Sequence, residues 1–164
     1  MKRSMLPLLL LALASGNALA GDQPWRQPRP QLFTGGQPDA RQLQEAAAAG
    51  ITTVIDLRAP GEDRGYDEQA AAERLGLRYV RLPIGGAADI NEANARTLDR
   101  LLKQDRHATL LHCASGNRVG ALLALAHARV DGASSEQALQ LGREAGLTSL
   151  EPVVRARLQA DGQP

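Results

Sequence analysis

The chain has 164 residues and one cysteine, which lies in the segment HCASGNRVG, residues 112–120. An apolar run typical of a buried strand precedes this segment, and a run typical of a buried helix follows it. Free backbone N–H groups and the helix dipole at a helix start attract anions. The same field stabilises a thiolate, so the position favours Cys113 as a nucleophile, with a buried structural thiol as the alternative.

The residues after Cys113 add a receptor for a tetrahedral oxyanion. Gly116 permits a backbone turn that a side chain would hinder. Arg118, five residues after the cysteine, can return over the loop and hold two oxygens of a phosphate. His112 is expected to point away from the site and to orient the loop by hydrogen bonding. The expected substrate-binding set is Ala114, Ser115, Gly116, Asn117 and Arg118.

The elements that must position this loop alternate between strand and helix patterns. Short β-branched or apolar runs predict strands at 32–38, 51–58, 77–84 and 107–112. Cap residues and apolar faces predict helices at 39–50, 66–76, 90–104, 118–130, 134–146 and 149–159. We therefore expect an α/β fold of three layers, α-β-α, with a central, mostly parallel sheet of four to five strands. Ligands bind such sheets at the carboxyl ends of the strands, where the loop lies.

The N-terminal region is expected to be a targeting segment. Residues 1–20 run from Lys2 and Arg3 through an apolar stretch to Ala-Leu-Ala, the order of a secretory signal peptide cut after Ala20. The apolar stretch is shorter than the roughly 20 residues of a membrane span, so no stable membrane insertion is expected after cleavage. Residues 21–31 contain three prolines and predict an extended leader with Trp25 on an exposed arm. The domain then covers 32–160, and the location is periplasmic.

The amino-acid composition limits the classes of partner and ligand that we expect. The formal net charge is +1, and removal of the signal peptide leaves about −1, so no basic surface for nucleic acid or anionic membrane is expected. The three histidines have no metal-ligand spacing with acids or the thiol, which predicts no metal and no cofactor. Aromatic residues make up 2% of the chain, so no stacking platform for phosphotyrosine is evident. We expect a monomer.

The segment from His112 to Arg118 resembles the H-C-x-x-G-x-x-R phosphate loop of cysteine-dependent protein tyrosine and dual-specificity phosphatases. LFTGGQP, VIDLR, YVRLPI and GLTSLEPVV are similar to segments of small bacterial phosphatase-like domains, either beta-lactamase-hydrolase-like or fused to NAD kinase. This resemblance covers about 32–158. It implies that the thiolate attacks phosphorus, that an aspartate protonates the leaving oxygen, and that water hydrolyses the cysteinyl-phosphate.

The resemblance also implies an acid on a loop upstream of the cysteine. Asp89 follows a strand end and is the first choice, while a helix cap is the alternative role for it. Glu62 and Asp63, in an earlier polar loop, are the substitutes. Asp56 lies within a strand and is expected to anchor a neighbour, and Arg58 either lines the pocket or is solvated.

The expected function is a periplasmic phosphatase that hydrolyses a phosphomonoester, either a phosphorylated small molecule or a phosphoprotein. Val119 stands where the resembled family often has a Ser or Thr whose hydroxyl stabilises the departing thiolate. This departure supports an alternative, a weak or inactive module that binds phosphate or a phosphorylated partner. A third possibility is a sulfurtransferase of rhodanese type, against which the arginine and glycine of the loop are expected to argue.

Overall fold

The computed structural model describes residues 24–105 and 107–160, and its centre is a five-stranded sheet in the order β1-β2-β5-β3-β4. The strands are β1 (Arg26–Arg29), β2 (Leu32–Gly35), β3 (Ile51–Asp56), β4 (Arg78–Arg81) and β5 (Ala108–His112). The pairs β2–β5, β5–β3 and β3–β4 are parallel, and only β1 is antiparallel to its neighbour. The predicted fold class is therefore confirmed.

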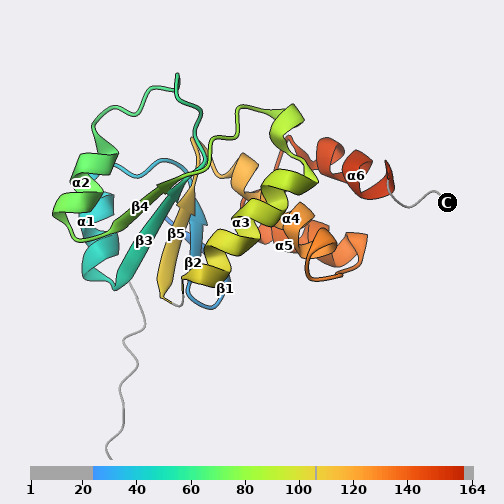
Figure 1. Ribbon diagram of the computed structural model, residues 1–164, viewed down its shortest axis with the longest axis horizontal. Coiled ribbons are helices and arrows are strands. Elements are labelled where there is room, and N and C mark those ends of the chain that lie inside the picture. Colours follow the sequence, from blue (N-terminus) through green and yellow to red (C-terminus); the bar gives the residue numbers. More distant parts are fainter. Residues whose placement is uncertain (1–23, 106, 161–164) are drawn as a thin grey trace, which may run out of the picture.

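The helices cover the two faces of this sheet unequally (Figure 1). On one face lie α1 (Ala40–Ala48) and α2 (Glu68–Arg74). The other face carries α3 (Glu92–Gln104), α4 (Asn117–Arg129), α5 (Ser135–Ala145) and α6 (Glu151–Ala160). A short 3-10 turn, η1 (Ala87–Asp89), precedes α3.

Side-chain alternation explains why both faces of the central strands are apolar. Val54 packs toward the α1 and α2 side, while the next residue, Ile55, joins the larger core under α3 to α6. Leu110 and Leu111 divide in the same way on β5. Since successive residues of a strand point to opposite faces, a strand covered on both sides reads as a continuous apolar run.

Local cap chemistry sets the helix starts. Asp39 and Gln42 form a complete capping box on α1, and Ser134 and Gln137 form another on α5, as the sequence predicts for these starts. The cap of α3 is Asn91, whose side chain accepts a hydrogen bond from the Asn94 N–H. The alternative role of Asp89 as the cap of this helix is therefore wrong.

The arm around Trp25 is part of the sheet layer rather than exposed. Strand β1 pairs with β2, and Trp25 packs against a cluster formed by Ala46, Ile51 and Leu110. A Cβ on Gly35 would lie 2.7 Å from the Trp25 ring, so the indole occupies the space that this glycine leaves. The prediction of an exposed arm at Trp25 is wrong because the edge of β2 offers both a strand partner and an apolar surface.

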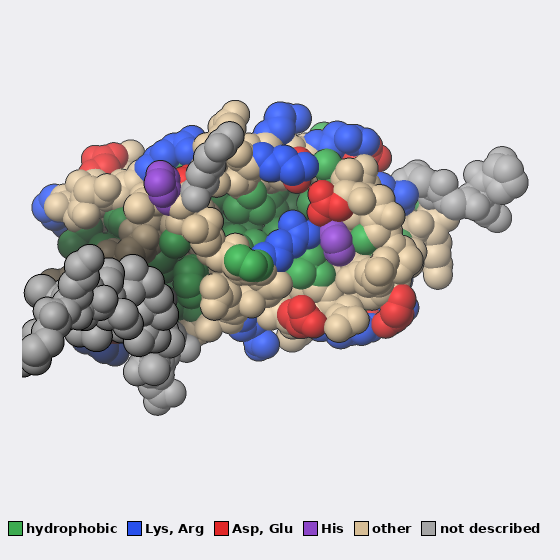
Figure 2. All heavy atoms as spheres, turned by 90° about the horizontal axis from the view of Figure 1, so that it is seen from below, with side chains coloured by type: hydrophobic (Ala, Val, Ile, Leu, Met, Phe, Trp, Pro, Cys, Tyr) green, Lys and Arg blue, Asp and Glu red, His purple; other side chains and the backbone are tan. Residues whose placement is uncertain are grey.

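A hollow lies on the face where the strands begin, which Figure 2 shows from below with an apolar floor. Its volume is about 200 Å³, and its lining includes Leu32, Leu102, Lys103 and His107. Leu32 begins β2 and the hollow lies near the start of β5, whereas Cys113 follows the end of β5. The hollow is thus separated from the cysteine loop by the length of the sheet.

Helix α4, which follows the cysteine loop, is buried along most of its length because α5 approaches it closely. Two glycines, Gly120 on α4 and Gly142 on α5, make this approach possible. A Cβ on Gly120 would overlap the backbone at Leu147 N and Gly142 O. This contact fixes the position of α4 and therefore of the loop that leads into it.

We predict that Gly120→Ala lowers the free energy of unfolding by about 3 kcal/mol, because the added methyl meets backbone atoms that cannot rotate away. Urea denaturation followed by far-UV circular dichroism measures the change. Gly61→Ala is the matched control, since a Cβ there meets no atom within 4 Å. It should shift stability by less than about 0.5 kcal/mol. Equal stability of the two variants would contradict the proposed helix contact.

Candidate active site

The single cysteine lies in a tight connection between β5 and α4. Strand β5 ends at His112, Cys113 follows, and α4 begins at Asn117. Gly116 is the N-cap and has a φ of 90°, a left-handed conformation that only glycine adopts at little cost. The chain therefore turns from strand to helix within four residues and aims the start of the helix at the thiol.

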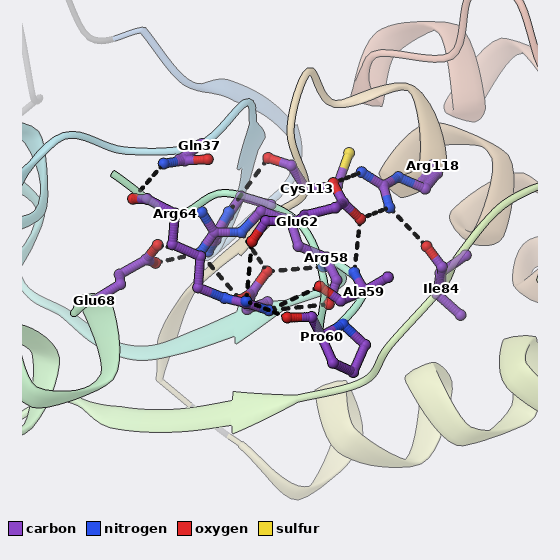
Figure 3. Close-up of polar contacts among 12 residues, drawn as sticks. Gln37, Arg58, Ala59, Pro60, Glu62, Arg64, Glu68, Ile84, Cys113 and Arg118 are labelled. Carbon is purple, nitrogen blue, oxygen red and sulfur yellow. Dashed lines mark hydrogen bonds and ion pairs between the residues drawn. The ribbon is translucent and has the colours of Figure 1, made fainter. Parts of the chain in front are cut away.

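The Cys113 side chain is buried, with 1% of its surface exposed, yet it is not in purely apolar surroundings. Its Sγ accepts a hydrogen bond from the Gly116 N–H at 3.1 Å. The sulfur points toward the Arg118 side chain (Figure 3), whose pKa is raised first by its hydrogen bond to Glu62 and also by its interaction with Cys113. An N–H donor and a guanidinium together make an electropositive setting, which is typical of a reactive thiol.

Arg118 is held by partners from two other loops. Its Nη1 and Nη2 donate to the two carboxylate oxygens of Glu62 at 2.5 Å and 2.6 Å. Nη1 also donates to the Ile84 carbonyl at 2.7 Å. The hydrogen bond to Glu62 raises the pKa of Arg118, and the same bond lowers the pKa of Glu62. The pair is therefore fully charged at neutral pH.

Arg118 retains two of its N–H groups for a ligand. A guanidinium carries five N–H groups, one on Nε and two on each terminal nitrogen. Glu62 and Ile84 engage both hydrogens of Nη1 and one of Nη2. The Nε–H and the second Nη2–H lie on one edge of the group, and this edge has the fork geometry that binds two phosphate oxygens. Glu62 thus orients the arginine, which also interacts with Cys113, so that an anion seated over the sulfur would meet the remaining edge.

The loop that carries Glu62 is organised by Arg64, a largely buried arginine that the sequence analysis did not single out. Its guanidinium donates to the carbonyls of Arg58, Ala59, Pro60 and Glu62 over 3.1–3.4 Å. Glu62 Oε1 also accepts the Ala59 N–H at 2.7 Å. An ionised carboxylate in this position has no proton to give, so Glu62 is a poor general acid.

Beneath the loop lies a cluster of charged side chains, Asp56, Arg58, Glu68 and His112, each no more than 1% exposed. Arg58 donates to both oxygens of Asp56 at 2.9 Å and 3.0 Å and also binds Glu68. Burial alone would raise the pKa of Asp56, but the hydrogen bonds from Arg58 outweigh it and bring the pKa to about 2. Arg58 is therefore neither solvated nor directed at the thiol, and Asp56 anchors it as expected.

His112 joins this cluster to the cysteine. Its Nδ1 lies 3.4 Å from the Cys113 carbonyl oxygen. Its Nε2 lies 2.8 Å from Glu68 Oε1, and neither atom has a hydrogen-bond partner among the described residues. His112 thus lies below the loop and points away from the thiol, toward α2.

The outer side of the loop is tied to two segments that the sequence did not assign to the site. The Ala114 carbonyl accepts the Gln37 N–H at 3.2 Å, and Ser115 forms a bridge with Gly36. The Asn117 side chain accepts the N–H of Thr148 at 2.9 Å. Asn117 therefore positions the segment before α6, and its side chain is not aimed at a ligand.

The candidate acids lie in different surroundings. Asp89 ends η1, is partly exposed, and its Oδ2 accepts the Gly85 N–H at 2.7 Å. Asp63 is exposed, and its Oδ1 accepts the Gly65 N–H at 2.8 Å. Asp89 follows the same strand end as Ile84, the partner of Arg118, which connects its loop to the site. Asp89 remains the predicted general acid, and Asp63 its substitute.

The loop departs from the phosphate-loop pattern in its length. Arg118 follows Cys113 by five residues, whereas H-C-x-x-G-x-x-R places the arginine six residues after the cysteine. The pattern's arginine position is taken by Val119, which is buried in the core and has no hydroxyl. The spacing therefore argues less strongly against sulfur transfer than expected. No group of three or more potential metal ligands occurs within 24–105 and 107–160.

Comparison with known proteins shows which sequences this chain is similar to. Residues 17–152 match the family model described as DSP-PTPase phosphatase fused to NAD+ kinase. A beta-lactamase hydrolase-like protein of Xylella fastidiosa is 37% identical over 106 residues, which are 62% of this chain and 24% of that protein. The chain thus spans about a quarter of the length of this relative.

Solved structures share the fold. A Neisseria meningitidis protein solved as a candidate phosphatase superposes with a TM-score of 0.69 at 22% identity, covering 82% of this chain and 96% of that one. The P. aeruginosa protein TpbA, in complex with pTyr, superposes with a TM-score of 0.64 at 20% identity, covering 86% and 94%. At these identities the likeness concerns the fold alone.

We predict that Glu62→Gln weakens vanadate binding about tenfold, because a neutral amide holds the guanidinium less firmly than a carboxylate does. Isothermal titration calorimetry on the purified chain gives the dissociation constant. Asp63→Asn, one residue further along the same loop, is the control and should bind vanadate as the unmodified chain does. Tighter binding by Glu62→Gln would show that Glu62 competes with the anion instead of orienting Arg118.

Proposed function

Because the chain belongs to the family of DSP-PTPase phosphatases fused to NAD+ kinase, we propose that it hydrolyses a phosphomonoester through a covalent cysteinyl-phosphate at Cys113. As a member of this family, the chain is a protein-tyrosine-phosphatase-like hydrolase. The covalent intermediate, the substrate and the cellular location are parts of the proposal.

One observation carries the mechanism: Cys113 Sγ lies at the start of α4 and accepts the Gly116 N–H, beside a guanidinium that keeps an open edge. A phosphate seated over the sulfur would be held by that edge of Arg118 and by N–H groups of the loop. These donors match the charge that develops on the phosphoryl oxygens during transfer.

The reaction then proceeds in two steps. The Cys113 thiolate attacks phosphorus, the bond from phosphorus to the ester oxygen breaks, and Asp89 gives its proton to the departing alcohol. Water next attacks phosphorus and loses a proton to the Asp89 carboxylate, and the sulfur–phosphorus bond breaks to release inorganic phosphate and the thiolate. The two steps together return Cys113 to the thiolate and Asp89 to its protonated form.

Val119 supports a slower variant of this function. With an apolar, buried side chain after Arg118, no hydroxyl from that position stabilises the departing thiolate. A module that binds phosphate or a phosphorylated partner and turns it over slowly or not at all is the corresponding alternative.

The short loop supports a second candidate, a sulfurtransferase that carries sulfur as a Cys113 persulfide. One residue fewer between cysteine and arginine means one backbone N–H fewer around the thiol than in H-C-x-x-G-x-x-R. A persulfide is smaller than a phosphoryl group and needs fewer donors. The family match favours the phosphatase, which is therefore the first proposal.

Export to the periplasm is proposed on the N-terminal sequence alone. Residues 1–20, which carry the expected signal peptide, lie outside the described residues, as do 21–23 of the leader. No helix within 24–105 and 107–160 has the length and apolar character needed to cross a membrane. We propose a monomer that acts on a phosphorylated small molecule or a phosphoprotein.

We predict that the chain hydrolyses a generic aryl phosphate and that Cys113→Ser abolishes this turnover while it keeps phosphate binding, because serine retains the loop but not the nucleophile. Phosphate release is measured beside vanadate binding by calorimetry. Equal turnover by both proteins would exclude the cysteine mechanism. Binding without turnover in the unmodified chain would favour the binding module, and cyanide-dependent consumption of thiosulfate would identify the sulfurtransferase.

We predict that Asp89→Asn lowers turnover of an alkyl phosphate by about 10²–10⁴-fold and that of an activated aryl phosphate far less, because only the poor leaving group needs a proton. The basic limb of the pH profile should flatten. Steady-state kinetics with both substrates measure these effects. Asp63→Asn is the comparison, and leaving-group sensitivity in that variant alone would place the acid on the earlier loop.

A further inference from the structure

A groove of about 420 Å³ lies between η1 and α6, and the proposed mechanism does not use it. Its lining consists of Ala87 and Ala88 on η1 and of Val153, Ala156, Arg157 and Ala160 on α6. The four α6 residues stand at i, i+3, i+4 and i+7, so they form one face of that helix. Figure 1 shows α6 beside the turn that leads into α3.

Both walls of the groove start from segments that position the active site. On one side, η1 ends at Asp89, the predicted general acid, and follows the loop whose Ile84 carbonyl accepts a hydrogen bond from Arg118. On the other side, the Asn117 side chain in the first turn of α4 accepts the N–H of Thr148, three residues before α6. The groove therefore lies next to the place where Asp89 would protonate a leaving group.

The chemistry of the lining favours an aliphatic leaving group over a peptide. Apart from Arg157, every lining side chain belongs to alanine or valine, so the groove has no side-chain hydrogen-bond acceptor and only one donor group. A peptide around a phosphorylated residue carries amide groups, which lose free energy when they leave water without partners. An aliphatic chain has no such groups and gains free energy as its surface leaves water. The single charge is positive, so it would repel a cationic leaving group.

The length of the groove sets the length of the chain that fits it. Val153 and Ala160 are seven residues apart on α6, which corresponds to about 10 Å along the helix axis. An extended chain advances about 1.2 Å per bond, so about eight carbon atoms would reach from one end to the other. Ala87, Ala88, Ala156 and Ala160 are exposed, so their methyl groups are open to contact along this length.

We propose that this groove binds the leaving group of the substrate, and that the substrate is a phosphomonoester of a linear aliphatic alcohol. The inference rests on the proposed function, because it assigns the groove to the alcohol that attack by Cys113 releases. Of the two substrate classes named above, it selects the phosphorylated small molecule. Val153, Ala156 and Ala160 thereby become residues that determine specificity.

The test compares butyl phosphate with octyl phosphate, which have the same reacting ester bond and differ only in chain length. Steady-state phosphate release by the purified chain should give a KM at least about tenfold lower for octyl phosphate at an unchanged kcat, because each buried methylene contributes about two- to fourfold to binding. Both substrates are used below the concentration at which octyl phosphate forms micelles. Equal KM values, or a higher kcat/KM for a phosphoserine peptide than for octyl phosphate, would overturn the inference.

A matched pair of variants on α6 locates the effect. Ala156→Glu places a carboxylate in the groove and should remove the advantage of octyl over butyl phosphate, because the aliphatic chain would take water away from that charge. Gln159→Glu adds the same charge at an exposed position of the same helix outside the groove lining, and it should keep the advantage. An advantage that persists in Ala156→Glu would place the aliphatic chain elsewhere on the molecule and contradict the assignment.

Binding to Cys113→Ser separates this inference from the proposed function. Calorimetry with butyl and octyl phosphate measures the effect of chain length without turnover, and octyl phosphate should bind more tightly by a similar factor. If the unmodified chain hydrolyses neither an alkyl nor an aryl phosphate, the proposed function fails, and the calorimetry still decides whether the groove binds the chain. If an aryl phosphate is hydrolysed and octyl phosphate binds no more tightly than butyl phosphate, only the assignment of the groove fails.

Discussion

The buried ion cluster around Asp56 and Arg58 is the constraint on which both halves of the site depend. Arg58 bridges Asp56 on β3 to Glu68 on α2, so the strand end and the helix cannot move apart without exposing a charge to apolar surroundings. From Glu68 the contacts lead to His112 and the backbone carbonyl of Cys113. From Asp56 they lead to the loop of Glu62.

The contacts that start from Asp56 end at Arg118, the residue that would bind the anion. Arg64 contacts Asp56 and donates to the carbonyls of residues 58–60 and 62, and this loop presents Glu62 to Arg118. The buried ion cluster therefore positions both Cys113 and Arg118, through two separate sets of contacts. Such an arrangement keeps both reacting groups in place although they lie in a connection of only a few residues.

Backbone packing, rather than the charged cluster, fixes the position of helix α4. The close approach of α4 and α5 at Gly120 and Gly142 leaves no room for a side chain, which fixes the axis of the helix behind Cys113. Asn117 ties its first turn to the segment before α6.

Sequence periodicity and cap chemistry determined the α/β class, the parallel sheet, most element positions and the place of the cysteine loop, because these features depend on residues close together in the chain. The capping boxes at Asp39 and Ser134 and the buried α4 are examples. The pairing of Glu62 with Arg118, the contact of Glu68 with His112 and the docking of Trp25 join residues far apart in the chain. No local pattern signals such contacts, since the sequence around a charged or aromatic residue does not say which distant residue will lie beside it. Only the tertiary structure could decide them.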